Sequence, residues 1–317
     1  MPNSVLTPSL ADCMVRVTES AAIAAERLVG RGDEKKADAA AVDAMRTAFN
    51  AVDFRGRVVI GEGERDEAPM LYIGEEVGTG TGPEIDIALD PLEGTTLTAK
   101  AMSNALAVLA IAPRGGLLHA PDTYMDKIAI GPGYPEGIVN LDATPAENIT
   151  ALAKHKGISV SEMTACVLDR PRHEEIIESL RSAGARIALI TDGDVAGVIA
   201  TTNPHTGIDL YVGSGGAPEG VLAAAALKCV GGQMFGRLVF RNDDEKKRAE
   251  RVGITDLGRT YALNELASGD TVFCATGVTD GSMLRGVKLK DGRVHTHSLI
   301  MTSTDGMVRY VQSDRPA

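Results

Sequence analysis

The chain has 317 residues, of which 44% are hydrophobic and 24% are charged, and its formal net charge is −11. This composition is typical of a globular protein with one large domain or two ordinary ones, and it excludes a disordered chain. The negative charge and an aromatic content of only 3% argue against binding to DNA, RNA or an anionic membrane.

Simple patterns exclude two further classes of protein. No apolar run approaches the ~20 residues that a membrane-spanning helix needs, and the N-terminus shows no signal peptide. The cysteines are scattered and form no C-x-x-C pair, so neither a zinc ribbon nor a redox motif is expected. We therefore expect a cytoplasmic protein with reduced thiols, which are Cys13, Cys166, Cys229 and Cys274.

Helix-like and strand-like segments alternate along the chain, which predicts an α/β fold. In the first half, residues 8–28 and 34–50 predict helices capped by Thr7 and Asp33, and Pro8 suits a first helical turn. Short apolar runs predict strands at residues 57–60, 84–89 and 106–111.

Gly and Pro cluster at residues 131–144, which predicts a domain boundary near residue 140. We expect a first domain at residues 1–140 and a second at residues 141–317. Further helices are predicted at residues 146–155, 172–183 and 217–230, and further strands at residues 186–190 and 208–212. Residues 240–252 are expected to form an exposed, charged connection, and the chain from Asp270 onward to be rich in strands.

Carboxylates follow several predicted strands in glycine-bearing turns, which is where α/β proteins bind ligands. In the first such turn, residues 90–95 read DPLEGT. Asp90 and Glu93 flank a tight turn, so both can face one hard cation. The free N–H groups at Gly94 and Thr95 suit a phosphate at the start of the next helix. The alternative is an ordinary strand–turn–helix capped by Asp and Thr.

A second acidic turn, GEGE at residues 61–64, would point Glu62 and Glu64 to the same side of an extended backbone. It could equally be a solvated turn. A third, DGD at residues 192–194, could bind sugar hydroxyls through its two acids or simply cap a helix.

A fourth segment, GSGGAPEG at residues 213–220, fits neither a dinucleotide fingerprint nor a P-loop. Glu219 could bind a metal, and Gly216 could let a substrate approach the backbone closely. The alternative is a glycine-rich helix start.

Basic residues cluster at residues 170–173, which read RPRH. Arg170 and Arg172 suit bidentate recognition of phosphate, although a charged surface loop has the same composition. Tyr124 could contact a substrate or lie at the edge of a core. No nucleophilic triad is indicated, since the chain has no G-x-S-x-G elbow and no H-E-x-x-H pair.

The DPLEGT segment resembles the metal and phosphate motif of the lithium-sensitive phosphatase superfamily. Its Glu93, where that superfamily usually carries Asp, resembles the class II fructose-1,6-bisphosphatases. Other segments resemble the same family in the same order: VTESAA at 17–22, GRGD at 30–33, GEGE at 61–64, DEAPMLYIGE at 66–75, RPRH at 170–173, DGD at 192–194 and GGAPEG at 215–220. The resemblance spans nearly the whole chain.

The resemblance implies a layered α/β/α/β/α sandwich of two α/β domains, the sugar phosphatase fold, assembled as a homo-oligomer (a dimer or tetramer). The first domain would bind metal and phosphate, and the second the sugar phosphate. The implied reaction is hydrolysis of the 1-phosphate of fructose 1,6-bisphosphate, with Mn²⁺ or Mg²⁺ as cofactor. Some members of the family also accept sedoheptulose 1,7-bisphosphate.

Carried over residue by residue, the resemblance implies three sets of site residues. The metal ligands would be Asp38, Glu62, Asp90, Glu93 and Glu219. The substrate-binding residues would be Glu93, Gly94, Thr95, Tyr124, Arg170, Pro171, Arg172, Asp192, Gly193, Asp194 and Gly216. The residues that position or polarise the attacking water would be Thr95, Glu62 and Asp66.

The chain departs from its relatives at Glu34, where some carry Lys, and at Arg170, where some carry Lys and the charge is kept. Two other functions fit the same motifs. One is a phosphatase of the same superfamily acting on an inositol phosphate or a nucleotide, although paired arginines favour a substrate with a second phosphate. The other is a protein that binds a sugar phosphate without turning it over, which the complete carboxylate set argues against.

Overall fold

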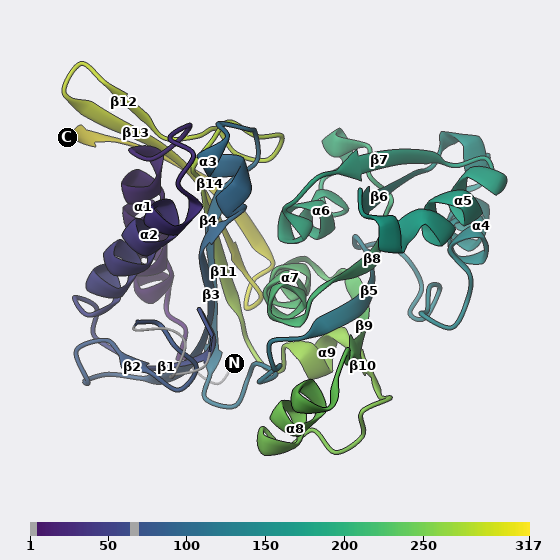
Figure 1. Ribbon diagram of the computed structural model, residues 1–317, viewed down its shortest axis with the longest axis horizontal. Helices are drawn as coiled ribbons and strands as arrows, with labels where there is room; N and C mark the ends of the chain where they lie inside the picture. The colour runs from purple at the N-terminus through teal and green to yellow at the C-terminus, as the bar shows by residue number, and fades with distance from the viewer. Residues whose placement is uncertain (1–4, 64–69) are drawn as a thin grey trace. The chain divides into compact units, whose positions relative to one another are not determined.

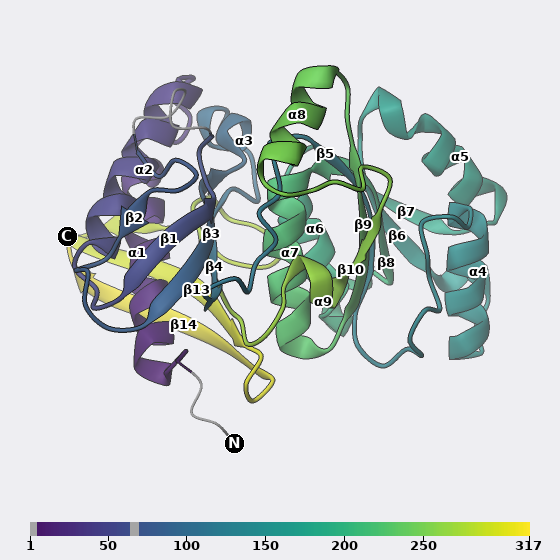
Figure 2. The ribbon, with the colours of Figure 1, turned by 90° about the horizontal axis from the view of Figure 1, so that it is seen from below.

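The computed structural model describes residues 5–63 and 70–317. Two compact units make up the chain, each with its own sheet, helices and apolar core (Figures 1 and 2). The first unit combines Met1–Leu118 with Ser268–Ala317, and the second is the continuous segment His119–Ala267. The predicted α/β class is therefore confirmed for both units.

The first unit begins with two predicted helices, α1 (Pro8–Glu26) and α2 (Glu34–Phe49). Both predicted caps are confirmed, because Thr7 Oγ1 accepts the Leu10 N–H at 3.2 Å and Asp33 Oδ1 accepts the Lys36 N–H at 3.0 Å. Each helix turns an apolar stripe toward the sheet, as the helical period requires.

Among the described residues, the first sheet has eight strands in the order β12-β13-β11-β4-β3-β1-β2, with β14 paired to β13. Its strands are β1 (Arg55–Ile60), β2 (Glu76–Val77), β3 (Glu84–Glu93), β4 (Leu106–Pro113), β11 (Val272–Gly277), β12 (Lys288–Lys290), β13 (Arg293–Thr302) and β14 (Met307–Pro316). The short helix α3 (Thr95–Ala99) follows β3. The apolar runs of β3 and β4 are buried along almost their whole length, as central strands should be.

The second unit has a sheet of six strands, again counted over the described residues, in the order β10-β9-β5-β8-β6-β7. They are β5 (Tyr124–Ile130), β6 (Thr164–Leu168), β7 (Arg186–Ile190), β8 (Leu210–Gly216), β9 (Gln233–Val239) and β10 (Thr260–Ala262). Its helices are α4 (Pro145–Lys156), α5 (Glu174–Ser182), α6 (Asp194–Ala200), α7 (Ala217–Val230), α8 (Asp243–Arg251) and α9 (Leu263–Leu266). Helices α6 and α7 cover one face of the sheet, and α4 and α5 the other (Figures 1 and 2).

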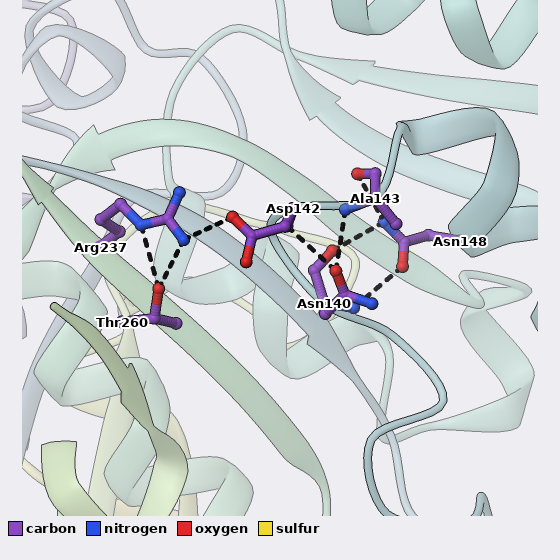
Figure 3. A network of polar contacts seen from close by, with 6 residues as sticks. All are labelled: Asn140, Asp142, Ala143, Asn148, Arg237 and Thr260. Atoms are coloured by element: carbon purple, nitrogen blue, oxygen red, sulfur yellow. Dashed lines mark hydrogen bonds and ion pairs between the residues drawn. The ribbon is translucent and has the colours of Figure 1, made fainter. Parts of the chain in front are cut away.

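The division into units differs from the boundary expected at residue 140. The Gly- and Pro-rich segment 131–144 lies inside the second unit, where polar contacts hold it (Figure 3). Asp142 forms an ion pair with Arg237 of β9 at 2.7 Å, and Asn148 of α4 donates to the Asn140 carbonyl at 2.9 Å. The end of the chain returns to the first unit, because β11 pairs with β4 over its whole length.

The expected exposed connection at residues 240–252 is wrong, because it contains the helix α8. Asn242 caps this helix by accepting the Glu245 N–H at 2.9 Å. Glu245 and Ala249, one turn apart, are buried among otherwise exposed charged residues. The segment was interpreted as a connection because most of its residues are charged, but it is an amphipathic helix whose buried face contains only two residues.

Two simpler expectations can also be compared with the structure. All four cysteines carry free thiols, and Cys166, Cys229 and Cys274 are buried. Across the described parts of the chain, the helices are too short or too polar to traverse a bilayer.

Candidate active site

The DPLEGT segment forms the end of β3 and the turn into α3. The strand does not end at Leu89 as expected but continues to Glu93, through an irregularity in its pairing with β4 between Asp90 and Glu93. A proline fits there because the regular ladder is interrupted. Asp90 Oδ1 accepts the Leu92 N–H at 2.9 Å, and the Glu93 side chain is buried.

Gly94 makes the turn into α3 possible. Its φ of 88° and ψ of 54° lie in the left-handed region, and a Cβ there would stand 2.8 Å from Leu97 Cδ1. The helix that follows is a single short turn. Thr95 is the first residue of α3, and only Gly94 separates it from Glu93 at the end of β3.

Three carboxylates from different elements lie close enough to change one another's ionisation. Burial, together with the negative charges of Asp90 and Asp38, raises the pKa of Glu62 to about 9. Burial, with the charge of Asp90, raises the pKa of Asp38 to about 6. The acidic cluster Asp38–Glu62–Asp90 thus brings together side chains from α2, the turn after β1 and the end of β3. A cation bound among them would stabilise their ionised forms, which repel one another in its absence.

A second set of contacts fixes the turn that carries Glu62. Its backbone N–H donates to the Leu71 carbonyl at 3.1 Å, and a Cβ on Gly61 would lie 2.1 Å from that same oxygen. Glu75 accepts the Leu71 N–H and also binds Arg46 of α2 at 2.6 Å. The turn is therefore tied to helix α2, which carries Asp38.

The donor set of the cluster suits a hard divalent cation, since every candidate ligand is a carboxylate. Within residues 5–63 and 70–317, no group of three or more His, Cys, Asp or Glu side chains is arranged so that it could hold a metal ion by itself. Asp66, expected to polarise water, and Glu64 lie outside the described residues. Glu219 belongs to the second unit.

Glu219 lies in the first turn of α7, where a carboxylate complements the helix dipole. A Cβ on Gly216 would stand 1.9 Å from Glu219 Oε2, so the carboxylate folds back over this glycine. The Glu219 side chain therefore occupies the space that a Cβ of residue 216 would need. Any residue other than glycine at this position would displace it.

The DGD segment leads into α6. Gly193, with φ 83°, accommodates the left-handed turn before the helix, and its N–H donates to Asp192 Oδ1 at 3.1 Å. Asp194 is buried in an ion pair with Lys127 of β5, whose Nζ also donates to the Gly216 carbonyl at 2.9 Å. Lys127 thereby links the DGD turn to the glycine-rich segment.

The RPRH segment contains a 3₁₀ turn, Pro171–His173, that is fixed to β8. Arg172 donates two hydrogen bonds to the Ser214 carbonyl, at 3.0 and 2.8 Å. Its guanidinium carbon lies 4.9 Å from the centre of the Tyr124 ring. Arg170 donates to the Asp169 carbonyl at 3.1 Å. Two of the expected substrate residues, Arg172 and Tyr124, are thus in contact.

His173 holds this turn in position against the neighbouring strands. The sequence alone did not indicate this role of His173. Its ring is fully buried, with Nε2 accepting the Ser214 N–H and Nδ1 facing the Leu168 carbonyl, each at 2.8 Å. The Nδ1–H tautomer satisfies both contacts. Burial lowers the pKa of His173, and the charge of Arg172 lowers it too, although the hydrogen bonds to Leu168 and Ser214 oppose this shift, so the ring is neutral at neutral pH.

Lys127 and Arg241 were also missed. In the sequence, Lys127 follows the charged Asp126, which suggests an exposed position, and Arg241 lies in the segment interpreted as a connection. Local patterns could not reveal their roles, because Lys127 pairs with Asp194 and Arg241 lies over the Tyr124 ring, and both of these partners are distant in the sequence.

Comparison with known proteins identifies the family. Residues 8–315 match the family described as bacterial fructose-1,6-bisphosphatase, glpX-encoded. The chain belongs to this family. It is 45% identical to a protein of Synechococcus sp. (strain JA-3-3Ab) and 46% identical to one of Prochlorococcus marinus (strain NATL1A), in each case over 95% of this chain. The alignments cover 93% and 94% of those relatives, and both are named D-fructose 1,6-bisphosphatase class 2/sedoheptulose 1,7-bisphosphatase.

Proposed function

We propose that this phosphatase hydrolyses the 1-phosphate of fructose 1,6-bisphosphate, giving fructose 6-phosphate and inorganic phosphate. Membership of the family names the reaction class, and the acidic cluster Asp38–Glu62–Asp90 is the observation that supports a reacting site in this chain. Sedoheptulose 1,7-bisphosphate is a second candidate substrate, because the named relatives carry both activities in their names.

The proposed cofactor is Mg²⁺ or Mn²⁺. Asp38 and Glu62 would hold one ion, and Asp90, Glu93 and Glu219 another. When bound, such ions polarise a phosphate and make water more acidic. The cluster supports this assignment, because a bound cation would offset both the burial of Glu62 and the repulsion from Asp90 and Asp38, which together raise its pKa to about 9.

The chain's own residues would then divide the work between the two ends of the substrate. Glu93, Gly94 and Thr95 would bind the reacting phosphate, and the Thr95 hydroxyl would orient the attacking water. Glu62, with Asp66, would polarise that water.

The second unit would bind the rest of the substrate, through Tyr124, Arg170, Pro171, Arg172, Asp192, Gly193, Asp194 and Gly216. The buried ion pair with Lys127 would hold the carboxylate of Asp194 in one orientation for a sugar hydroxyl. We further propose, from the resemblance of the motifs, that the chain belongs to the lithium-sensitive phosphatase superfamily and acts as a cytoplasmic homo-oligomer.

A phosphate-release assay with a panel of phosphorylated sugars, inositol phosphates and nucleotides tests the proposal. We expect turnover of fructose 1,6-bisphosphate only with added Mn²⁺ or Mg²⁺. Full turnover after exhaustive chelation would falsify the metal assignment. Preference for an inositol phosphate or a nucleotide, or tight binding without release of phosphate, would point to the two other functions that the motifs allow.

A pair of variants tests the division of the site. Arg172→Ala removes a contact to a phosphate that does not react, so it should raise KM far more than it lowers kcat. Thr95→Ala acts at the reacting phosphate and should lower kcat with little change in KM. If the two variants give the same profile, or Arg172→Ala is silent, the division is wrong.

A further inference from the structure

A second arginine, Arg241, shares the Tyr124 ring with Arg172. Its guanidinium carbon lies 4.6 Å from the ring centre, against 4.9 Å for Arg172. Arg241 comes from the segment between β9 and α8, far from Arg172 in the sequence. Two guanidinium groups thus lie against one aromatic ring, and guanidinium is the side-chain group best suited to bidentate binding of a phosphate.

A buried carboxylate fixes Arg241 in this position. Glu245 Oε1 accepts from Arg241 Nε at 2.7 Å and forms an ion pair with Nη2 at 2.5 Å, while Oε2 accepts the Arg241 backbone N–H at 2.7 Å. The Glu245 side chain is only 1% exposed, whereas that of Arg241 is 53% exposed. One edge of the guanidinium is thus anchored, and the rest of the group faces solvent.

The same carboxylate connects Arg241 to the strand that carries the tyrosine. Thr123, the neighbour of Tyr124, places its hydroxyl within hydrogen-bond distance of two acceptors, Glu245 Oε2 at 2.9 Å and the Val239 carbonyl at 2.6 Å. Burial tends to raise the pKa of Glu245, but hydrogen bonds from Arg241 and Thr123 lower it to about 2. The carboxylate therefore stays ionised, and Arg241, Tyr124 and Arg172 form one preorganised cationic group.

We propose that Arg241 is a further binding residue for the phosphate that is not cleaved, acting together with Arg172, and that Glu245 is its positioning residue. This inference rests on the proposed function and assigns a residue that the family motifs did not indicate. An arginine whose inner edge is fixed by a carboxylate keeps outward N–H donors for a phosphate and loses little side-chain entropy when it binds.

The first test uses Arg241→Ala with fructose 1,6-bisphosphate. We expect KM to rise roughly tenfold or more and kcat to stay within about twofold, because this phosphate contributes equally to ground state and transition state. Lys247→Ala, on the exposed side of α8 and paired with Asp244 at 3.4 Å, is the matched control and should leave both constants unchanged.

The second test measures binding of fructose 6-phosphate, the product that keeps only this phosphate, by calorimetry. Arg241→Ala should raise the Kd for fructose 6-phosphate roughly tenfold, in parallel with the rise in KM. Arg241→Lys should recover part of this lost affinity. Glu245→Gln should weaken it less, because Arg241 remains but is held less firmly. A purely structural role for Arg241 would instead lower kcat and the melting temperature together and leave the affinity for fructose 6-phosphate unchanged.

The outcomes separate this inference from the proposed function. If the wild-type protein fails to hydrolyse fructose 1,6-bisphosphate, the proposed function is wrong and this inference goes with it. If the wild type is active and Arg241→Ala is kinetically silent or changes only kcat, the inference alone is overturned.

Discussion

At the scale of single residues, the most informative group is the acidic cluster Asp38–Glu62–Asp90, because its members oppose one another's ionisation. Asp90→Asn removes one charge and keeps the oxygen that accepts the Leu92 N–H. We expect it to abolish turnover and yet to raise the melting temperature of the metal-free protein by about 2 °C. Thermal unfolding in chelator and in Mn²⁺, with the exposed Glu136→Gln as a control of equal charge change, decides this. A lower melting temperature in chelator would show that Asp90 stabilises the fold by itself.

Gly216 gives a second prediction at this scale. Its φ of −60° and ψ of 140° suit any residue, so Gly216→Ala should not strain the backbone. The added Cβ would instead displace the Glu219 carboxylate, which lies 1.9 Å from its position. We expect the variant to fold normally but to need about 10–100-fold more metal for half-maximal activity.

The matched comparison for Gly216→Ala is Glu219→Ala, alone and combined with it. If Gly216 acts through Glu219, the double variant should be no worse than Glu219→Ala alone. Additive losses would mean that Gly216 serves the substrate directly.

The sequence could indicate a common site only for residues that lie next to one another in the chain. Asp90, Glu93 and Gly94 share one turn, so their spacing alone indicated a common site. The link between Asp194 and Lys127, and that between His173 and Ser214, depend on the pairing of strands far apart in the chain. No local pattern carries that information, which is why these supporting contacts emerged only from the structure.

At the scale of elements, α8 is the helix whose stability depends most clearly on one side chain, Glu245. We expect Glu245→Gln to lower the free energy of unfolding by about 1–3 kcal/mol at pH 7, because it weakens charge-assisted bonds to Arg241 in a buried position. Hydrogen bonds lower the pKa of Glu245 from 4.5 to about 2 despite its burial, so its contribution is complete above pH 4.5. It is lost as the pH falls toward 2.

Denaturant titrations at several pH values test this assignment. The difference in unfolding free energy between the wild type and Glu245→Gln should shrink steadily as the pH falls below 4.5. Glu250→Gln, an exposed acid on the same helix, should show a small difference that does not depend on pH. If the difference in unfolding free energy between the wild type and Glu245→Gln stays the same at every pH, packing and not the charge of Glu245 provides the stabilisation.

Helices and strands differed in how well the sequence predicted them. The capped helices α1, α2 and α7 begin within a residue of their expected starts, because their end signals are local. Strand β3 extends beyond its expected end, since pairing with β4 resumes after Pro91. Helix α8 was missed because its segment is almost entirely charged, and one of the two residues in its buried stripe, Glu245, is itself an acid.

At the scale of the whole molecule, the sequence did not predict which segments share a unit. The Gly- and Pro-rich residues 131–144 carry every local sign of a linker, yet Asn140 and Asp142 hold them to α4 and β9. Conversely, nothing in residues 268–317 indicates that they return to complete the first sheet. Such pairings are long-range, and local composition cannot encode them.

The second unit is a continuous segment with its own core, and it should fold alone. Residues 119–267 contain every strand of the six-stranded sheet, and their apolar core includes Ile128, Leu152, Val167, Leu180 and Val212. In contrast, residues 1–140 lack β11 and β13, so the edge of β4 and part of the first core would be exposed. We expect cooperative urea unfolding for the segment 119–267 and no cooperative transition for 1–140.

The first unit can be rebuilt in one chain to make this comparison strict. The Ser268 N–H donates to the Gly116 carbonyl at 2.7 Å, so the two ends of the unit already touch where the second unit is inserted. A short glycine linker from Leu118 to Ser268 should therefore restore a folded protein that contains all the strands of the first sheet. Far-UV circular dichroism and urea titration of this chain and of residues 1–140 measure the difference directly. If residues 1–140 fold cooperatively while the rebuilt unit does not, β11 and β13 are not what completes the first core. The boundary expected from composition near residue 140 would then describe the folding unit better than the strand pairing does.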